Sequence, residues 1–177
     1  MRFVKKTLLT LFGLIIAAIA VGVLLPSSVH VERSVTVAAP PDKVFAVLND
    51  YKHFNRWSPW FGKDPDADYR TQGPATGVGA KFIWNSEVPE VGSGSQEIIA
   101  TQPGRSITVH LDFGGQGTAT SVFDIAPVPD GSRVTWQLDT AFGYDLIGRY
   151  LGLFFDGMIG PDYEAGLANL KRYLEDS

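Results

Sequence analysis

Three aspartates, Asp64, Asp66 and Asp68, alternate as the first ligands of a calcium-binding loop do. The EF-hand pattern next requires a glycine at position 69 for a sharp turn and a glutamate at position 75 to bind the ion with both oxygens. This chain has Tyr69 and Ala75 at those positions. We therefore predict a solvated acidic loop and no metal site.

General acid–base catalysis requires a titratable side chain held inside a pocket, and few residues are candidates. The histidines are His30 after the apolar N-terminal run, His53 in a short predicted helix and His110 in a predicted strand. Each is predicted to be a surface residue, and His110 alternates with the apolar face of its strand. Glu97 is the best remaining candidate for a buried acid, but an exposed or ion-paired carboxylate is the favoured interpretation. We therefore assign no catalytic residue.

The aromatic side chains are the largest apolar side chains in the chain. They can pack in an ordinary core or line a cavity that holds a hydrophobic ligand, and both interpretations stay open. Tyr163 could also orient a ligand through its hydroxyl. The candidate ligand-binding residues are Trp57, Trp60, Phe82, Trp84, Phe113, Phe123, Trp136, Tyr163 and Leu167.

Alternating apolar residues predict the strands that would position these side chains. The first strand spans Val31 to Val37 and is interrupted only by Arg33. Pro103-Gly104 and Asp130-Gly131 predict turns between later strands, because glycine tolerates a positive φ. Further strands are expected at residues 80–85, 96–100, 107–113, 122–125 and 133–139.

Helical spacing replaces this alternation in three segments. Pro41 can occupy a first helical turn, where its missing N–H costs nothing. A second short helix should end at Ser58-Pro59. In the C-terminal helix, Gly166 would allow close approach to a sheet, and Asp162 and Glu164 suit the N-terminus. Its predicted apolar face consists of Ile159, Tyr163, Leu167, Leu170 and Leu174.

This order of elements predicts an α+β fold with an antiparallel sheet covered on one face. Such a sheet cannot close around a single helix, so it must curve. Ala119 and Ser121 share a strand face with Phe123 and Ile125, and small residues beside aromatic ones leave space. We predict a cup with an apolar interior.

The segment Thr7–Leu25 has no charged side chain and is long enough to span a bilayer of roughly 30 Å as a helix. Arg2, Lys5 and Lys6 precede it, so the N-terminus should be cytoplasmic and the domain extracytoplasmic. The alternative is a signal peptide cleaved after Ala18-Ile19-Ala20, giving a secreted domain. Apolar sequence continues past that site, which favours a retained anchor.

Composition limits the remaining functions. The chain of 177 residues has a formal charge of −4, but three of its 15 basic residues precede position 30, which leaves 12 against 19 acidic ones. A balance of −7 argues against nucleic acid and against electrostatic docking on anionic lipid. No cysteine is present, so disulfides and thiolate chemistry are excluded. We expect residues 1–29 to form the N-terminus, anchor and linker, and 30–177 one domain.

The segment Leu146–Ile159 is richly apolar. It is expected to form a lid and the first turns of the long helix. The alternative is a lip that faces lipid and exchanges a ligand with the bilayer.

Four segments between Val31 and the C-terminus, outside the anchor, carry a family resemblance. They are VERSVTVAAPPDKVFAVLNDYKHFNRWSPW, Gly77-Val78-Gly79-Ala80 leading to Trp84, DGSRVTWQLD and IGPDYEAGLANLKRYLED. Together they resemble the START-type helix-grip superfamily (SRPBCC), in its polyketide cyclase/dehydrase-like branch. The resemblance implies a seven-stranded antiparallel sheet around a long helix, with a cavity between them. It also implies a ligand, because members bind lipids, sterols, polyketides or hormones, and some catalyse cyclisation.

The leading hypothesis is a membrane-anchored, non-catalytic domain that binds a small hydrophobic molecule or lipid without a cofactor. One alternative is a cyclase or dehydratase type of enzyme, which needs an acid or base near the aromatic residues. The other is an interaction module whose interior is filled by its own side chains. An interior pocket below roughly 300 Å³ would favour this last alternative.

Overall fold

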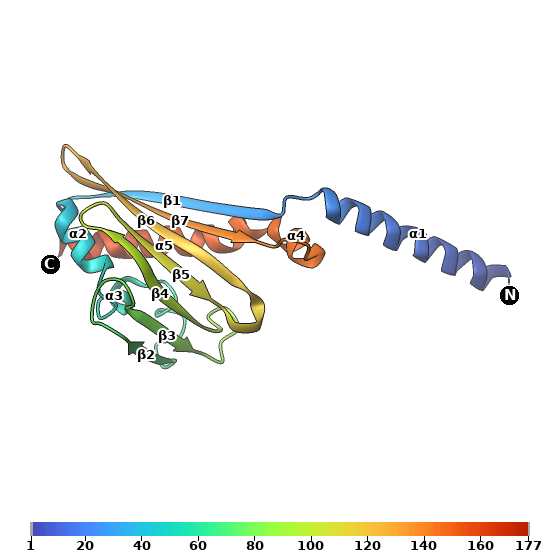
Figure 1. The fold of residues 1–177 in the computed structure, drawn as a ribbon, viewed down its shortest axis with the longest axis horizontal. Helices are drawn as coiled ribbons and strands as arrows, with labels where there is room; N and C mark the ends of the chain where they lie inside the picture. Colours follow the sequence, from blue (N-terminus) through green and yellow to red (C-terminus); the bar gives the residue numbers. More distant parts are fainter. Residues whose placement is uncertain (1, 177) are drawn as a thin grey trace.

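The computed structural model describes residues 2–176, which form an apolar helix followed by one α+β domain (Figure 1). The helix, α1 (Arg2–Leu24), projects away from the domain, and its Phe3–Leu24 part is long and apolar enough to cross a membrane. A signal sequence has the same length and composition. The linker between α1 and the first strand consists of Leu25, Pro26 and Ser27.

The domain contains one antiparallel sheet with the strand order β1-β7-β6-β5-β4-β3-β2, which confirms the predicted fold. Its first and last strands in the sequence are therefore neighbours. The strands are β1 (Ser28–Val37), β2 (Asp68–Gln72), β3 (Lys81–Asn85), β4 (Ser93–Gln102), β5 (Ser106–Asp112), β6 (Thr118–Val128) and β7 (Gly131–Ala141).

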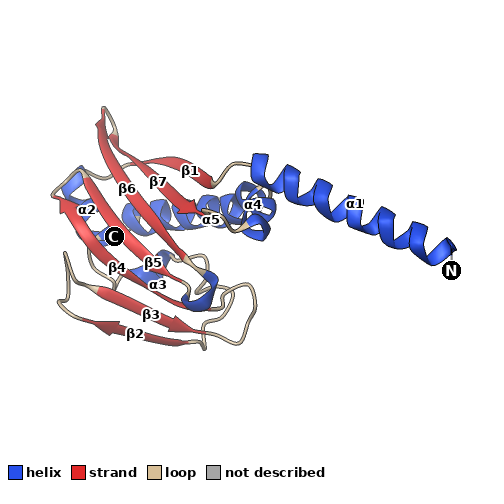
Figure 2. Ribbon diagram, turned by 45° about the vertical axis from the view of Figure 1, so that its right-hand side comes forward, coloured by secondary structure: helices blue, strands red, loops and turns tan. Residues whose placement is uncertain are grey.

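Four helices and one 3₁₀ turn accompany the sheet. The long helix α5 lies across its concave face, and α4 lies between the start of α5 and α1 (Figure 2). Their bounds are α2 (Pro41–Leu48), α3 (Phe54–Trp57), η1 (Gly114–Gln116), α4 (Leu146–Gly152) and α5 (Phe155–Glu175).

The apolar face of α5 packs against the sheet as its spacing predicts. Tyr163, Leu167 and Leu170 are all buried there. A Cβ atom at Gly166 would lie 2.8 Å from the Trp136 ring and 3.0 Å from Pro59, so the helix approaches the sheet closely where that side chain is missing.

The turns form where glycine was expected. Gly104 has a φ of 69° between β4 and β5, and Gly131 has a φ of 140° between β6 and β7. Ser132 then fixes the second turn by donating a hydrogen bond to the carbonyl of Ala39 at 2.7 Å.

Arg33 interrupts the apolar face of β1 for a structural reason. Its guanidinium pairs with Asp156 at 2.9 Å and with Glu164 at 2.7 Å, both on α5. Gly160 lies directly beneath, because a Cβ atom there would be 2.1 Å from the Arg33 Nη2 atom. The arginine therefore ties β1 to the first turns of α5.

Several predicted details differ from the structure. Asp162 and Glu164 do not lie at a helix N-terminus, because α5 begins at Phe155 and continues through Pro161. Asp68 is not in a loop but begins β2, whose side chains are mostly exposed. The first strand begins at Ser28, three residues before its predicted start at Val31.

Candidate functional site

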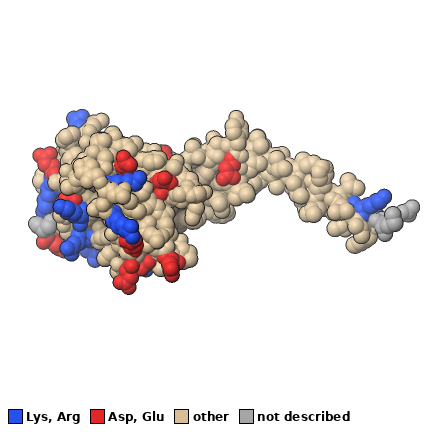
Figure 3. Space-filling view, turned by 60° about the horizontal axis from the view of Figure 1, so that its bottom comes forward, with Lys and Arg blue, Asp and Glu red and all other residues tan. Residues whose placement is uncertain are grey.

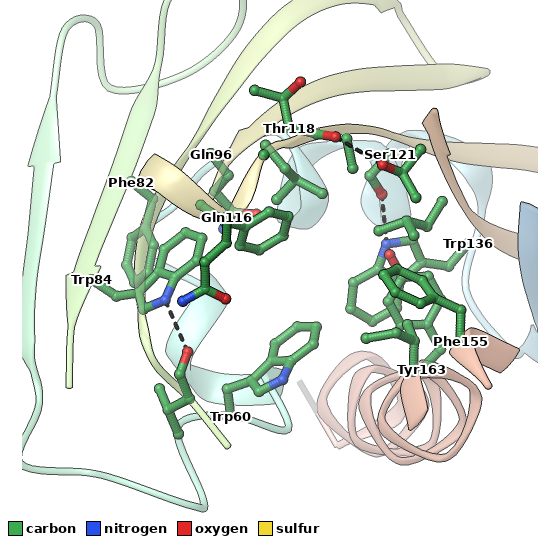
Figure 4. A pocket seen from close by; sticks show the side chains of 18 of the residues that line it. Trp60, Phe82, Trp84, Gln96, Gln116, Thr118, Ser121, Trp136, Phe155 and Tyr163 are labelled. Atoms are coloured by element: carbon green, nitrogen blue, oxygen red, sulfur yellow. Dashed lines mark hydrogen bonds between the residues drawn. The ribbon is translucent and has the colours of Figure 1, made fainter. Parts of the chain in front are cut away.

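A cavity of about 440 Å³ lies between the concave face of the sheet and α5 (Figure 4). Seven of the nine candidate ligand-binding residues line it: Trp60, Phe82, Trp84, Phe113, Phe123, Trp136 and Tyr163. The other two, Trp57 and Leu167, are buried in the core behind its wall. The cavity volume exceeds the roughly 300 Å³ below which a filled interior was expected.

One wall of the cavity is a stack of aromatic rings. Trp136 stacks on Tyr163 with ring centroids 3.8 Å apart and on Phe123 at 5.0 Å. Trp60 meets Trp136 edge to face at 5.9 Å. These contacts fix rigid, flat surfaces of the kind that bind apolar ligands.

The opposite wall comes from β3, β4 and β5. Trp84 donates a hydrogen bond to the carbonyl of Val91 at 3.2 Å, and its ring meets Phe113 edge to face. Figure 4 shows the Phe82 and Trp84 side chains facing Trp136 and Tyr163 across the open space. The ligand space is therefore bounded by aromatic groups on both sides.

Ala119 and Ser121 provide room between these walls. Both line the cavity on the inner face of β6, next to Phe123, as the alternation of small and large residues predicts. The Ser121 hydroxyl accepts a hydrogen bond from Trp136 Nε1 at 2.8 Å and donates one to the Gln137 carbonyl at 2.9 Å. The small residue is thus also the polar anchor of the Trp136 ring.

Tyr163 contributes a phenol to the same corner. Burial raises the pKa of Tyr163 well above its ordinary value of 10, although a hydrogen bond with Ser121 lowers it in part. The hydroxyl therefore stays protonated at neutral pH, where it can donate a hydrogen bond but cannot act as a base.

Gln96 is the polar exception on the apolar wall of β4. Its side chain is only 8% exposed and lines the cavity beside Phe82 and Leu111. Among the cavity-lining side chains that the structure describes, Gln96 has a buried nitrogen, Nε2, without a hydrogen-bond partner. An unpaired buried donor costs about 1–3 kcal/mol, so it calls for an acceptor in the cavity.

The charged residues that line the cavity are acidic and lie at its rim. Glu90 and Asp145 are exposed, and Asp145 caps α4 by accepting a hydrogen bond from the Ile147 N–H at 3.0 Å. Within residues 2–176, no lysine, arginine or histidine lines the cavity. Its interior is therefore suited to a neutral molecule.

The candidate acids and bases lie outside this lining. His30 pairs with Asp139 at 2.8 Å, His53 with the Tyr173 hydroxyl at 2.8 Å, and Glu97 with Lys81 at 3.7 Å. His110 is exposed on β5, as predicted. His30, His53 and Glu97 are therefore engaged in hydrogen bonds or ion pairs outside the cavity.

The three alternating aspartates do not converge on one point. Asp64 accepts hydrogen bonds from the Ser86 hydroxyl and, through its carbonyl, from the Tyr69 hydroxyl at 2.7 Å, whereas Asp68 pairs with Arg70. No group of three metal-ligating side chains occurs among the described residues. The acidic segment instead fastens the loop before β2 to the region after β3.

Sequence reasoning missed the residues at the cavity rim and one on its wall. Gln116, Thr118 and Phe142 come from the ends of β6 and β7 and their loops, where no periodic pattern identifies them. Gln96 did carry a signal. It is a polar residue on the same strand face as Ile98, which is fully buried.

Three solved structures that share this fold are distant from this chain in sequence. The Aha1 dimer from Colwellia psychrerythraea matches with a TM-score of 0.60 and 15% identity, over 83% of this chain and 96% of that chain. The KanY protein gives 0.62 and 21%, over 85% and 99%. The di-domain ARO/CYC StfQ of the steffimycin biosynthetic pathway gives 0.61 and 12%, over 84% of this chain and 51% of that one. These likenesses establish the fold.

Comparison with curated proteins found no match. Residues 28–175, by contrast, match a protein family described as polyketide cyclase/dehydrase and lipid transport. The match begins at the first residue of β1 and ends at the last residue of α5, so it covers the sheet, the cavity and the gripping helix. The chain therefore belongs to the polyketide cyclase/dehydrase and lipid transport family, in which a helix-grip domain encloses a ligand cavity.

Proposed function

We propose that this protein is a membrane-anchored, non-catalytic domain that binds a small neutral hydrophobic molecule or lipid. The observation that carries the proposal is the 440 Å³ cavity with aromatic walls. A space of this size is within the range of small-molecule sites, and the eleven aromatic side chains among its described lining residues offer a ligand a large apolar contact. Seven of the nine candidate residues would contact the ligand, whereas Trp57 and Leu167, which were also expected to bind it, lie outside the lining and would support the wall instead.

The charge and hydrogen-bonding groups of the lining narrow the ligand class. An anionic headgroup inside the cavity would lie without a basic partner, which is costly in an apolar environment. Gln96 Nε2 needs an acceptor oxygen. A molecule that is mostly hydrocarbon and carries one carbonyl oxygen satisfies both conditions.

The proposed lack of catalysis rests on the positions of the titratable groups. Glu97 and the histidines lie outside the lining, and the raised pKa of Tyr163 removes it as a base at neutral pH. Of the two rim carboxylates, Asp145 caps α4 and Glu90 is exposed to solvent. Binding needs none of these groups to titrate.

Anchoring is proposed from α1. Its apolar length suits a bilayer, and Lys5 and Lys6 precede most of it, so we place the N-terminus in the cytoplasm and residues 28–176 outside. A protein cleaved after Ala20 and secreted would keep the cavity but lose this location.

Native mass spectrometry of the full chain, extracted in mild detergent, tests the proposal. We expect a neutral apolar species to be released on collisional activation, and added neutral carbonyl compounds to raise the melting temperature. The Trp60→Ala variant should lose much of both effects, and Trp57→Phe, behind the wall, should keep them. The proposal fails if no apolar species is bound and no lipid or aromatic compound stabilises the protein.

The second candidate is a cyclase or dehydratase type of enzyme, and the family and the Tyr163 phenol inside the cavity favour it. Incubation with a linear poly-β-ketone tests this function. An intramolecular aldol condensation would form one carbon–carbon bond and release one water. Tyr163→Phe should then abolish turnover while substrate still binds, whereas a binding protein yields no cyclised product at all.

An interaction module whose interior is filled by its own side chains is the weakest candidate. The cavity is larger than the roughly 300 Å³ below which such a filled interior was expected.

A further inference from the structure

The anchor helix does not leave the domain freely but packs against α4. The Tyr150 hydroxyl donates a hydrogen bond to the carbonyl of Ala18 at 2.6 Å. Gly22 is buried, and a Cβ atom there would lie 3.1 Å from the Tyr150 ring and 3.4 Å from Leu146. A glycine in α1 thus makes room for the first turns of α4.

Arg149 closes the end of α1. Its Nη1 atom donates hydrogen bonds to the carbonyls of Val23 at 2.8 Å and Leu25 at 3.2 Å, and its Nε atom donates one to Gly143 at 2.9 Å. The last carbonyls of a helix have no intrahelical partner and carry partial negative charge, so a guanidinium is a favourable cap there. Arg149 therefore binds α1, α4 and the end of β7 into one unit.

This contact sets the depth of α4 relative to α1. Ala18 lies six residues before Leu24, the last residue of α1. At a rise of 1.5 Å per residue, the Tyr150 hydroxyl contacts α1 about 9 Å inside its C-terminal end. If α1 spans a bilayer, α4 must lie at the depth where interfacial helices bury their apolar faces, roughly 5–10 Å.

The surface of α4 and the start of α5 has the composition that this depth requires. We call its exposed apolar side chains the collar, and each of them is more than half exposed: Ile147, Leu151, Leu153, Phe154 and Met158. On the face shown in Figure 3, uncharged side chains surround a single acidic patch where the domain meets α1, whereas lysine and arginine gather at the far end of the domain. The collar thus continues the apolar surface of α1.

The cavity opens at the same end of the domain. In this antiparallel sheet, the end where β1 begins is also where β7 and β5 end and where β6 begins, since Ser28 pairs with Ala141 and Asp112 with Thr118. The rim residues Gln116, Thr118 and Phe142 all belong to that end. Phe155 lines the cavity in the first turn of α5, next to Phe154 of the collar.

We infer that the collar is seated in the headgroup region of the bilayer that α1 crosses, so that the cavity mouth faces the membrane. This inference rests on the proposed anchoring of α1. It makes the bilayer the source of the ligand and fixes the orientation of the domain through Arg149 and Tyr150. The acidic domain suits neutral lipid, because attraction to anionic lipid would need basic residues.

The absence of cysteine from the chain allows a direct test with single fluorescent labels. The full chain is reconstituted in phosphatidylcholine vesicles with a label at Leu151→Cys or Phe154→Cys. Ile99→Cys and Val78→Cys are the controls, because they replace exposed apolar residues outside the collar. Ile15→Cys, in the middle of α1, reports whether the anchor is inserted.

Labels at 151 and 154 should be quenched by brominated acyl chains, as for an interfacial helix. Aqueous iodide should quench them roughly fivefold less than it quenches the labels at 78 and 99. The inference is overturned if 151 and 154 are as open to iodide as the controls while Ile15→Cys is quenched by lipid. Protection of 151 and 154 from both quenchers would also overturn it, because the collar would then be covered by protein. If Ile15→Cys is itself open to iodide, the proposed anchoring fails instead.

Arg149→Met tests separately whether the Arg149 hydrogen bonds hold the domain against α1. It removes the hydrogen bonds to α1 but keeps an apolar stem, so the labels at 151 and 154 should become more accessible to iodide while Ile15→Cys stays inserted. An unchanged collar signal would show that Arg149 does not hold the domain in place.

Discussion

The two ends of the domain are built from the same strands but differ in their interiors. At the end near α2, the apolar residues Val44, Ile107 and Leu170 are fully buried. At the end near α1, Ala119, Ser121 and Gln96 occupy equivalent inward positions and a cavity remains. We call these the closed end and the hollow end.

The difference arises from side-chain size and from the covering helices. Helix α2 packs against β5, β6 and β7 and covers the closed end, whereas α4 packs mainly against α1 and the edge strand β1. Alternation along a strand is the same at both ends, so alternation fixes the fold and the sizes of the inward residues fix the cavity. Stability and ligand binding should therefore respond to mutations at different ends.

The largest expected effect is on stability at the closed end. Leu170→Ala should lower the free energy of unfolding by about 2–5 kcal/mol, because a fully buried leucine leaves a cavity when truncated. Denaturant unfolding of the full chain in detergent measures the change. Ligand affinity of the folded fraction should stay the same, and a loss below about 1 kcal/mol would contradict a close-packed closed end.

Filling the hollow end should weaken ligand binding without lowering the stability of the protein. Ala119→Leu should reduce ligand affinity by about tenfold or more, because the added side chain occupies ligand space. Stability should stay the same or rise. The matched control is Ala80→Leu, which enters close-packed surroundings and should cost about 1–3 kcal/mol. Equal destabilisation by both variants would show that the hollow end is filled in solution.

Gln96→Leu separates polar recognition from packing. We expect neutral carbonyl compounds to bind roughly fivefold to tenfold more weakly, while purely hydrocarbon ligands bind as well or better, because about 1 kcal/mol of hydrogen bonding is lost. Isothermal titration of both ligand classes measures the difference. The control, Gln116→Leu, lies at the exposed rim and should discriminate less. Equal weakening for both ligand classes would argue against the proposed acceptor.

The smallest expected effect is a pH dependence at the hollow end. A hydrogen bond to Asp139 raises the pKa of His30 above its ordinary value of 6.5. The stabilisation is therefore fully present below pH 6.5 and is lost as the pH rises through the folded-state pKa. The melting temperature should fall slightly between pH 6 and 8, and His30→Asn should flatten that slope. A rise over the same range would contradict the assignment.

Much of this architecture was predictable because apolar residues recur at the regular spacings of strands and helices. The inward faces of β5, β6 and β7 follow from simple alternation, and the buried face of α5 follows from its helical spacing. The pairing of Ala119 and Ser121 with Phe123 even predicted where space would remain.

The elements that were missed lack such signals. The strand β2 has the sequence DYRTQ with only Tyr69 partly buried, so it shows no alternating apolar pattern. Asp162 and Glu164 follow a proline, which usually begins a helix, yet α5 begins six residues before Pro161 because Phe155 and Ile159 already pack against the rim of the cavity. Tertiary contacts overrode the local preference there.

The strand order has a consequence for how the protein forms during synthesis. β1 follows the anchor directly, but its neighbour in the sheet is β7, which is made about a hundred residues later. If α1 is the proposed anchor, the first strand must therefore wait beside the membrane until nearly the whole chain has crossed. The collar arrives later still, because α4 and α5 follow β7. Folding should be slow for this reason, and any chain cut short before Gly131 would leave β1 as an unpaired edge.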